Sequence, residues 1–163
     1  MADYSATVHW QRHGADFLAQ RYSRVHQWSF DGGLAFSASA SPQVVPGPWS
    51  DPAAVDPEEA FVASLSSCHM LWFLALAAKA GWVVDDYRDV AIGQMRRDGA
   101  GKLAMTEVRL RPQVRFGEGR EPEAAQLAAL HAAAHAECFI ARSVKSDIQI
   151  EPQPWDVETP CTI

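Results

Sequence analysis

The chain has 163 residues, of which 48% are hydrophobic and 21% are charged. This balance is typical of a folded globular protein and excludes a disordered one, and the length allows one domain with a sizeable core. Fourteen Lys and Arg against twenty Asp and Glu give a net charge of −6. No run of basic residues exceeds two, so the sequence offers no basic surface for nucleic acid.

Residues 1–12 lack the basic start and apolar stretch of a secretory signal peptide, so we expect a cytoplasmic protein. In that compartment Cys68, Cys138 and Cys161 should be thiols at rest, and any disulfide should be transient or catalytic. The cysteines form no CxxC pair, which excludes a zinc ribbon or a thioredoxin-like motif.

Two strands are expected near the N-terminus, over residues 22–30 and 34–39, joined by the turn Asp31-Gly32-Gly33. Alternation places Arg24 on the bulky face of the first strand, which should be the buried face. Either its guanidinium meets an anionic partner inside the protein, or Arg24 packs by its stem with its head in water. A Pro/Gly-rich irregular segment, residues 41–57, follows.

A long helix is expected from Asp56, a good N-cap residue, to Gly81, a good C-terminal stop. Residues 60–78 carry no charge, a length that could cross a bilayer, but polar side chains lie at the centre and no basic cluster flanks it. We therefore expect no membrane span but a helix buried on all sides. A domain this small cannot easily surround such a helix alone, which favours a dimer that shares it.

Further strands are predicted over residues 90–96, 103–116 and 147–151, and a second helix over residues 122–142. Strands, helix, strands, helix and strand in this order indicate an α+β fold.

Cys68 lies in the middle of the first helix, where the helix dipole does little to lower the pKa of a thiol. A reactive Cys68 would need another cation, and Arg24 is the best candidate; the alternative is an inert, buried cysteine. Cys138, midway along the second helix, could face Cys68 as a resolving thiol. Glu58 precedes Cys68 by ten residues, about 15 Å of rise, so a direct link needs a broken helix or a second subunit.

A metal site is the competing interpretation. His131, His135 and Cys138 are spaced four and three residues apart, so they should project from one helix face. With Cys68 or His69 they would offer ligand types that zinc accepts. This spacing matches no established metal signature, and histidines on an Ala-rich helix are common, so the sequence favours no metal.

The motifs around both cysteines resemble those of a known family. Residues 56–69 (DPEEAFVASLSSCH) resemble the central-helix motif of the OsmC/Ohr family, and residues 137–144 (ECFIARSV) resemble its second-cysteine segment. The resemblance covers most of the chain, to about Pro152. It implies a single OsmC/Ohr-like domain over residues 1–163, with antiparallel sheets around long buried central helices. It also implies an intertwined homodimer with its active sites at the subunit interface.

The same resemblance implies thiol-dependent reduction of organic hydroperoxides in oxidative stress defence. No cofactor is implied, and the reductant would be an external dithiol, of the lipoyl type, or a low-molecular-weight thiol. Cys68 would match the attacking cysteine and Cys138 the resolving one, while Glu58 would match the glutamate that orients an arginine, for which Arg24 is the candidate. Neither nucleic acid nor a membrane is expected as a partner.

An apolar entrance for organic peroxides could be lined by Trp28, Phe61 and Trp72, each of which could equally be plain core. His69 stands where Ohr-type enzymes usually carry an apolar aromatic residue; it could donate a hydrogen bond to the leaving oxygen or be a core histidine. The segment 22–33 looks more like the OsmC-like branch than like Ohr itself. The alternative function is a metal-binding, ligand-binding or redox-sensing OsmC-like protein without peroxidase turnover.

Overall fold

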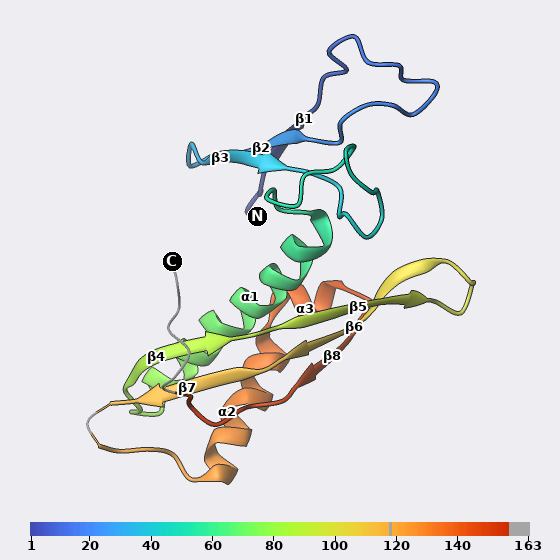
Figure 1. The fold of residues 1–163 in the computed structure, drawn as a ribbon. Coiled ribbons are helices and arrows are strands. Elements are labelled where there is room, and N and C mark those ends of the chain that lie inside the picture. The colour runs from blue at the N-terminus through green and yellow to red at the C-terminus, as the bar shows by residue number, and fades with distance from the viewer. Residues whose placement is uncertain (118, 157–163) are drawn as a thin grey trace. The chain divides into compact units, whose positions relative to one another are not determined.

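The computed structural model describes residues 1–117 and 119–156, so Cys161 lies outside the described residues. The chain forms two compact units; the first comprises residues 1–60 and the second begins at Phe61 (Figure 1). The expectation of a single domain over residues 1–163 stays a prediction.

The first unit holds an antiparallel sheet in the order β1-β2-β3. Its strands are β1 (Ala6–His9), β2 (His26–Phe30) and β3 (Ala35–Ala38). The predicted hairpin is confirmed, with Gly33 at a φ of +87° in its turn. Strand β1 was not predicted, and β2 begins four residues later than expected because the Arg24 backbone N–H donates to the Trp49 carbonyl (2.8 Å) instead of to a strand.

Helix α1 (Pro57–Lys79) confirms both predicted boundaries. At its start the Glu59 backbone N–H donates to Asp56 Oδ1 (2.7 Å) and the Asp56 N–H donates to Glu59 Oε2 (3.1 Å), which together form a capping box. At its end Gly81 has a φ of +81° and the Trp82 N–H donates to the Ala77 carbonyl (3.0 Å). This left-handed termination satisfies carbonyls that the helix itself leaves free.

Replacing Asp56 with Ala is expected to lower the free energy of unfolding by about 1 kcal/mol, because the Glu59 backbone N–H would lose its acceptor. Urea unfolding followed by circular dichroism measures the loss. Glu121→Ala, which removes an exposed carboxylate, is the control. Equal stability of the Asp56 variant and the wild type would contradict the capping role.

The second unit is built on two small sheets, of order β4-β7 and β5-β6-β8. Their strands are β4 (Val84–Asp89), β5 (Ile92–Arg97), β6 (Leu103–Leu110), β7 (Pro112–Phe116) and β8 (Asp147–Ile150). Strand β8 runs parallel to β6, and the other pairs are antiparallel. The strand predicted over residues 103–116 is interrupted at Arg111, whose backbone N–H donates to the Asp89 carboxylate (2.6 Å), and β4 was not predicted.

The second predicted helix is in fact two. Helix α2 (Ala124–Glu137) ends at Cys138, whose extended backbone (φ −65°, ψ 108°) separates it from the short helix α3 (Phe139–Ser143). Cys138 Sγ accepts a hydrogen bond from the Ala141 backbone N–H (3.4 Å) and so caps α3. The expectation that Cys138 lies midway along a continuous helix is therefore wrong.

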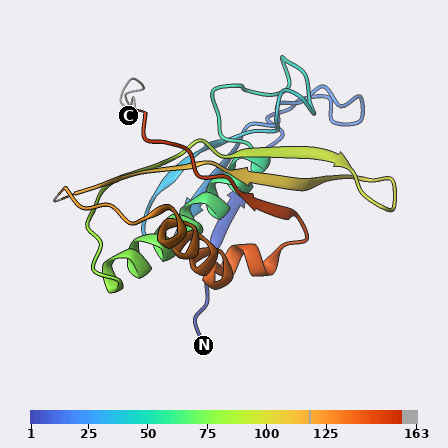
Figure 2. The same ribbon diagram turned by 90° about the horizontal axis from the view of Figure 1, so that it is seen from below.

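All three helices lie on the same face of the strands of the second unit (Figures 1 and 2). One core cluster centres on Leu65, Val108 and Leu110, and a second on Phe73, Ala77 and Ala134. Alternation along β6 points Val108 and Leu110 toward the helices and the intervening Arg109 outward.

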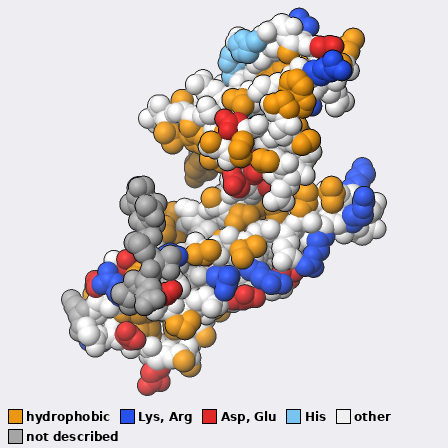
Figure 3. Space-filling model, in the orientation of Figure 1, with side chains coloured by type: hydrophobic (Ala, Val, Ile, Leu, Met, Phe, Trp, Pro, Cys, Tyr) orange, Lys and Arg blue, Asp and Glu red, His pale blue; other side chains and the backbone are white. Residues whose placement is uncertain are grey.

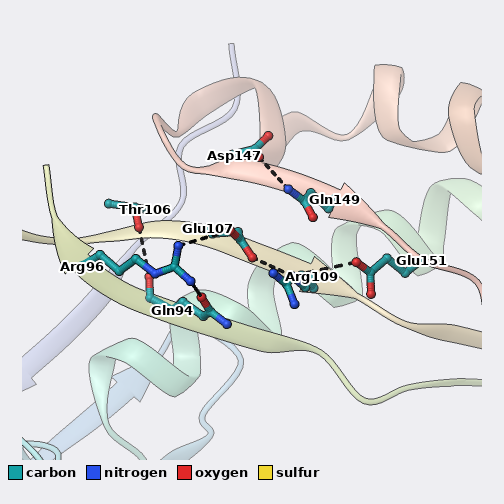
Figure 4. Close-up of polar contacts among 8 residues, drawn as sticks. All are labelled: Gln94, Arg96, Thr106, Glu107, Arg109, Asp147, Gln149 and Glu151. Carbon is teal, nitrogen blue, oxygen red and sulfur yellow. Dashed lines mark hydrogen bonds and ion pairs between the residues drawn. The ribbon is translucent and has the colours of Figure 1, made fainter. Parts of the chain in front are cut away.

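The outward face of this unit carries charged side chains. Figure 3 shows Lys and Arg side chains interspersed with Asp and Glu along its strands, with hydrophobic side chains between them. Glu107 pairs with Arg109 (2.6 Å) and Arg96 (3.9 Å), and Arg109 also approaches Glu151 (3.8 Å), as Figure 4 shows. Ion pairs at a partly exposed surface add little stability. The opposite face, with Val108 and Leu110, packs against the helices.

Within one chain α1 buries a single stripe of residues rather than all its sides. That stripe is spaced by four residues and consists of Leu65, His69, Phe73 and Ala77. Leu71, on another side, is 60% exposed, so the expected burial on all sides is not met by one subunit. Among the described residues α1 is the one helix long and apolar enough to cross a membrane, which is weak evidence because the core helix of a soluble protein passes the same criterion.

Candidate active site

Two thiols meet where α1 passes the junction of α2 and α3. Cys68 comes from the middle of α1 and is half-buried, whereas Cys138 is only 1% exposed. The Cys138 thiol donates a hydrogen bond to the Cys68 sulfur. Both cysteines are free thiols here, so the pair is in its reduced form.

The environments of the two thiols differ, and this difference suits them to different roles. Burial, and after it the hydrogen bond to Cys68, raise the pKa of the Cys138 thiol to about 11. Cys138 therefore keeps its proton at neutral pH and can donate it to a Cys68 thiolate. Only Cys68 combines contact with its partner and access from outside, which suits an attacking thiol.

A histidine pair lies beside the thiol pair. His69, which follows Cys68 on α1, places Nε2 at 3.1 Å from Nδ1 of His131 on α2, and the two rings are parallel within 5°. Phe73 stacks on the other side of His131 with ring centroids 4.4 Å apart. His69 is 1% exposed and His131 3%, so both imidazoles are buried, and a hydrogen bond from His69 to the leaving oxygen stays a prediction.

Burial keeps both imidazoles neutral. Loss of solvation lowers the pKa of His69 to about 4, helped by His131 and His135, and it lowers the pKa of His131 to about 4. His69 Nδ1 and His131 Nε2 are buried without a hydrogen-bond partner. The pair is thus joined at its inner nitrogens and unpartnered at its outer ones.

The metal interpretation finds no support in this geometry. Cys138 is the C-cap residue that ends α2, so it does not lie within one continuous helix with His131 and His135 as expected. Within residues 1–117 and 119–156, no group of three or more His, Cys, Asp or Glu side chains is arranged to hold a metal ion.

The other two predicted catalytic residues belong to the first unit. Nη1 of Arg24 donates to the carbonyls of Gln20 (2.9 Å) and Tyr22 (2.6 Å), and its guanidinium lies 3.9 Å from the centre of the Tyr22 ring. Glu58 Oε2 is buried without a hydrogen-bond partner, and no ion pair joins the two residues in the described part of the chain. Because α1 is unbroken, Glu58 and Cys68 cannot touch along it.

The predicted substrate-contacting aromatic residues all have packing partners. Trp28 donates from Nε1 to His26 Nε2 (2.8 Å) and packs against Phe36. Phe61 packs against the Leu65 cluster, and Trp72 meets Phe139 edge to face, with ring centroids 5.4 Å apart. Their role as a substrate entrance stays a prediction.

Sequence reasoning missed Asp89, at the end of β4. Its carboxylate accepts hydrogen bonds from Ser66 Oγ (2.6 Å) and from the Arg111 backbone N–H (2.6 Å), so it ties α1 to the strands two residues before Cys68. Burial raises the pKa of this carboxyl group, against the lowering effect of both hydrogen bonds. No sequence signal marked it, because strand β4 itself was not recognised.

Comparison with known proteins places this chain in a family. A family model described as OsmC-like protein matches residues 50–153. An OsmC-like protein of unknown function from Vibrio cholerae is 49% identical, with a TM-score of 0.91 over 94% of this chain and 100% of that one. No curated protein matches.

More distant structures share the fold. An organic hydroperoxide resistance protein from Elizabethkingia anophelis is 18% identical, with a TM-score of 0.66 over 96% of this chain and 97% of that one. One from Bacillus subtilis is 18% identical, with a TM-score of 0.62 over 94% and 98%. The α+β fold with antiparallel sheets and packed helices is that of these proteins, and the matched residues 50–153 include both cysteines. The chain therefore belongs to the family of OsmC-like proteins.

Proposed function

We propose that this protein reduces organic hydroperoxides through Cys68 and Cys138. The observation that carries the proposal is the contact between an accessible thiol and a buried, protonated one. Two structural neighbours, which are organic hydroperoxide resistance proteins, support the same class of substrate.

In the first step the Cys68 thiolate attacks the distal oxygen of ROOH. The O–O bond breaks, the alkoxide takes up a proton and leaves as an alcohol, and Cys68 becomes a sulfenic acid. The hydrogen bond from the Cys138 thiol stabilises the thiolate before attack, since a donor favours the charged form of its acceptor.

In the second step Cys138 attacks the sulfenic sulfur of Cys68. A disulfide forms, and the hydroxyl of the sulfenic acid leaves as water with the proton of the Cys138 thiol. An external dithiol then reduces the disulfide by two exchange steps and is itself oxidised to a disulfide. Contact between the two thiols favours this step over oxidation of Cys68 by a second peroxide.

We further propose that Arg24 and Glu58 reach the thiol pair from the second subunit of a homodimer. The exposed apolar side of α1, with Leu71 60% exposed, would give such a dimer its contact surface. An Arg24 guanidinium near Cys68 would add to the stabilisation of the thiolate, and the unpartnered Glu58 oxygen would orient it. Arg24→Ala should then slow sulfenic acid formation at Cys68 and leave the rate of the attack of Cys138 on the sulfenic acid unchanged.

The proposal is tested by adding one equivalent of cumene hydroperoxide to the reduced protein and recording intact and peptide-mapped mass spectra. The expected product has lost two hydrogens and carries a Cys68–Cys138 cross-link. Oxygen addition at Cys68 alone would remove Cys138 as the resolving thiol. Absence of reaction at both cysteines would overturn the proposed function.

A further inference from the structure

The thiol pair and the histidine pair are adjacent contacts between the same two helices. His69 directly follows Cys68 on α1, and His131 precedes Cys138 by seven residues, two turns along the side of α2 that faces α1. Among the described residues, these two pairs make the only side-chain hydrogen bonds between α1 and the segment from α2 to Cys138. An interaction that fixes the position of the two histidines therefore also constrains the distance between the two cysteines.

The remaining contact between α1 and α2 is apolar and includes small side chains. Ala77 and Ala134 lie in one cluster with Phe73. Apolar contact is not directional, so it specifies the register of the two helices less sharply than a hydrogen bond does. The 3.1 Å contact between His69 and His131 is directional, so it fixes the register of the two helices.

That register decides where Cys138 lies. Cys138 follows the last residue of α2 in an extended conformation, and its sulfur is held locally by backbone N–H groups, that of Ala141 at 3.4 Å and that of Ile140. Disulfide formation requires the two sulfurs to approach to about 2 Å with a restricted torsion angle. A shift of α2 by a fraction of a turn would remove Cys138 from Cys68.

The histidine pair is not explained by stability alone. In either tautomer, the neutral pair leaves one N–H and one lone pair unpartnered at His69 Nδ1 and His131 Nε2, both buried. Apolar residues of similar size would avoid this desolvation. We propose that His69 and His131 are positioning residues that hold α1 and α2 in the register in which Cys138 reaches Cys68.

This proposal rests on the proposed two-cysteine function, but the disulfide that it concerns can be measured without peroxide. In a glutathione buffer the two protein thiols give up two electrons and two protons as their S–S bond forms. One glutathione disulfide takes these up and becomes two glutathione thiols. The equilibrium constant reports the effective concentration of one protein thiol at the other.

Two nearly isosteric substitutions separate hydrogen bonding from packing. His131→Asn keeps a polar atom near the position of Nδ1, which contacts His69, whereas His131→Leu removes it. We expect the leucine variant to lower the effective concentration by about tenfold or more and the asparagine variant to stay within about threefold of the wild type. Sulfenic acid formation at Cys68 with cumene hydroperoxide should change little in either variant.

Leu127→Ala is the matched control. Leu127 lies near the start of α2 and packs against the Phe73 cluster, so this substitution should lower the stability of the protein without altering the surroundings of the thiols. An equal loss of effective concentration in Leu127→Ala and His131→Leu would overturn the positioning role. The pair His69→Gln and His69→Met repeats the comparison from α1 if His131→Leu does not fold.

The outcomes separate the two proposals. A wild-type protein that forms a disulfide, together with an unchanged His131→Leu variant, overturns the positioning role alone. A wild-type protein that forms no Cys68–Cys138 disulfide in any glutathione buffer overturns both. A loss in His131→Leu with recovery in His131→Asn supports the positioning role.

Discussion

Replacing Cys68 with Ser is expected to lower the second-order rate constant for reduction of cumene hydroperoxide by about 1000-fold or more, because a hydroxyl at neutral pH is a far weaker nucleophile than a thiolate. The substitution replaces the sulfur atom with oxygen and nearly keeps the size and position of the side chain in α1. The effect is measured as the rate at which the peroxide is consumed in the presence of dihydrolipoamide, with a colorimetric assay of the remaining peroxide.

The two other cysteines provide the controls for this experiment. Cys138→Ser should still react once with peroxide, since Cys68 remains, but it should stop as a sulfenic or sulfinic acid instead of a disulfide. Cys161→Ser should behave as the wild type if the chemistry resides in the pair that the structure brings together. Full turnover by Cys68→Ser would show that peroxide reduction takes place elsewhere.

Acid is expected to destabilise the protein through the histidine pair. In the folded state the pKa values of His69 and His131 are lowered to about 4, against 6.5 for an ordinary histidine. Between these values the unfolded chain binds more protons than the folded one. The free energy of unfolding therefore falls as the pH drops from 6.5 toward 4, by up to about 3 kcal/mol for each histidine.

Urea unfolding at pH 7.5, 5.5 and 4.5 measures this dependence, and the double variant His69→Leu/His131→Leu should lose most of it. The raised pKa of Asp89 acts in the opposite direction, since its protonation favours the folded state, so the histidine effect is seen best as the difference between wild type and double variant. A double variant with the same pH dependence as the wild type would contradict the assignment.

Local signals in the sequence were sufficient for several elements. Asp56 and Gly81 act on backbone groups within a few residues of themselves, so the boundaries of α1 could be predicted and are confirmed. The turn at Gly33 is equally local, because a positive φ suits glycine. The family resemblance also came from local motifs, one around each cysteine.

Two elements that the sequence predicted as continuous are interrupted in the structure. The strand expected over residues 103–116 is interrupted because the Arg111 N–H donates to the Asp89 side chain, which lies 22 residues earlier. The helix expected over residues 122–142 ends at Cys138, although the Ala-rich composition would allow it to continue. The end of α2 at Cys138 has no proline or glycine to mark it, whereas Pro112 directly follows Arg111 and could have marked the break in the strand.

The sequence by itself determined the family, because motifs around two cysteines are those of OsmC-like proteins. Only the tertiary structure decided which groups meet. It placed the Cys138 thiol against Cys68 and His131 against His69, across sequence separations of 70 and 62 residues. Such contacts depend on how α1 and α2 pack. The burial of apolar surface that drives packing is not directional, so the sequence does not indicate which apolar surfaces will meet. The burial that raises the pKa of Cys138 and lowers those of both histidines arises from the same packing.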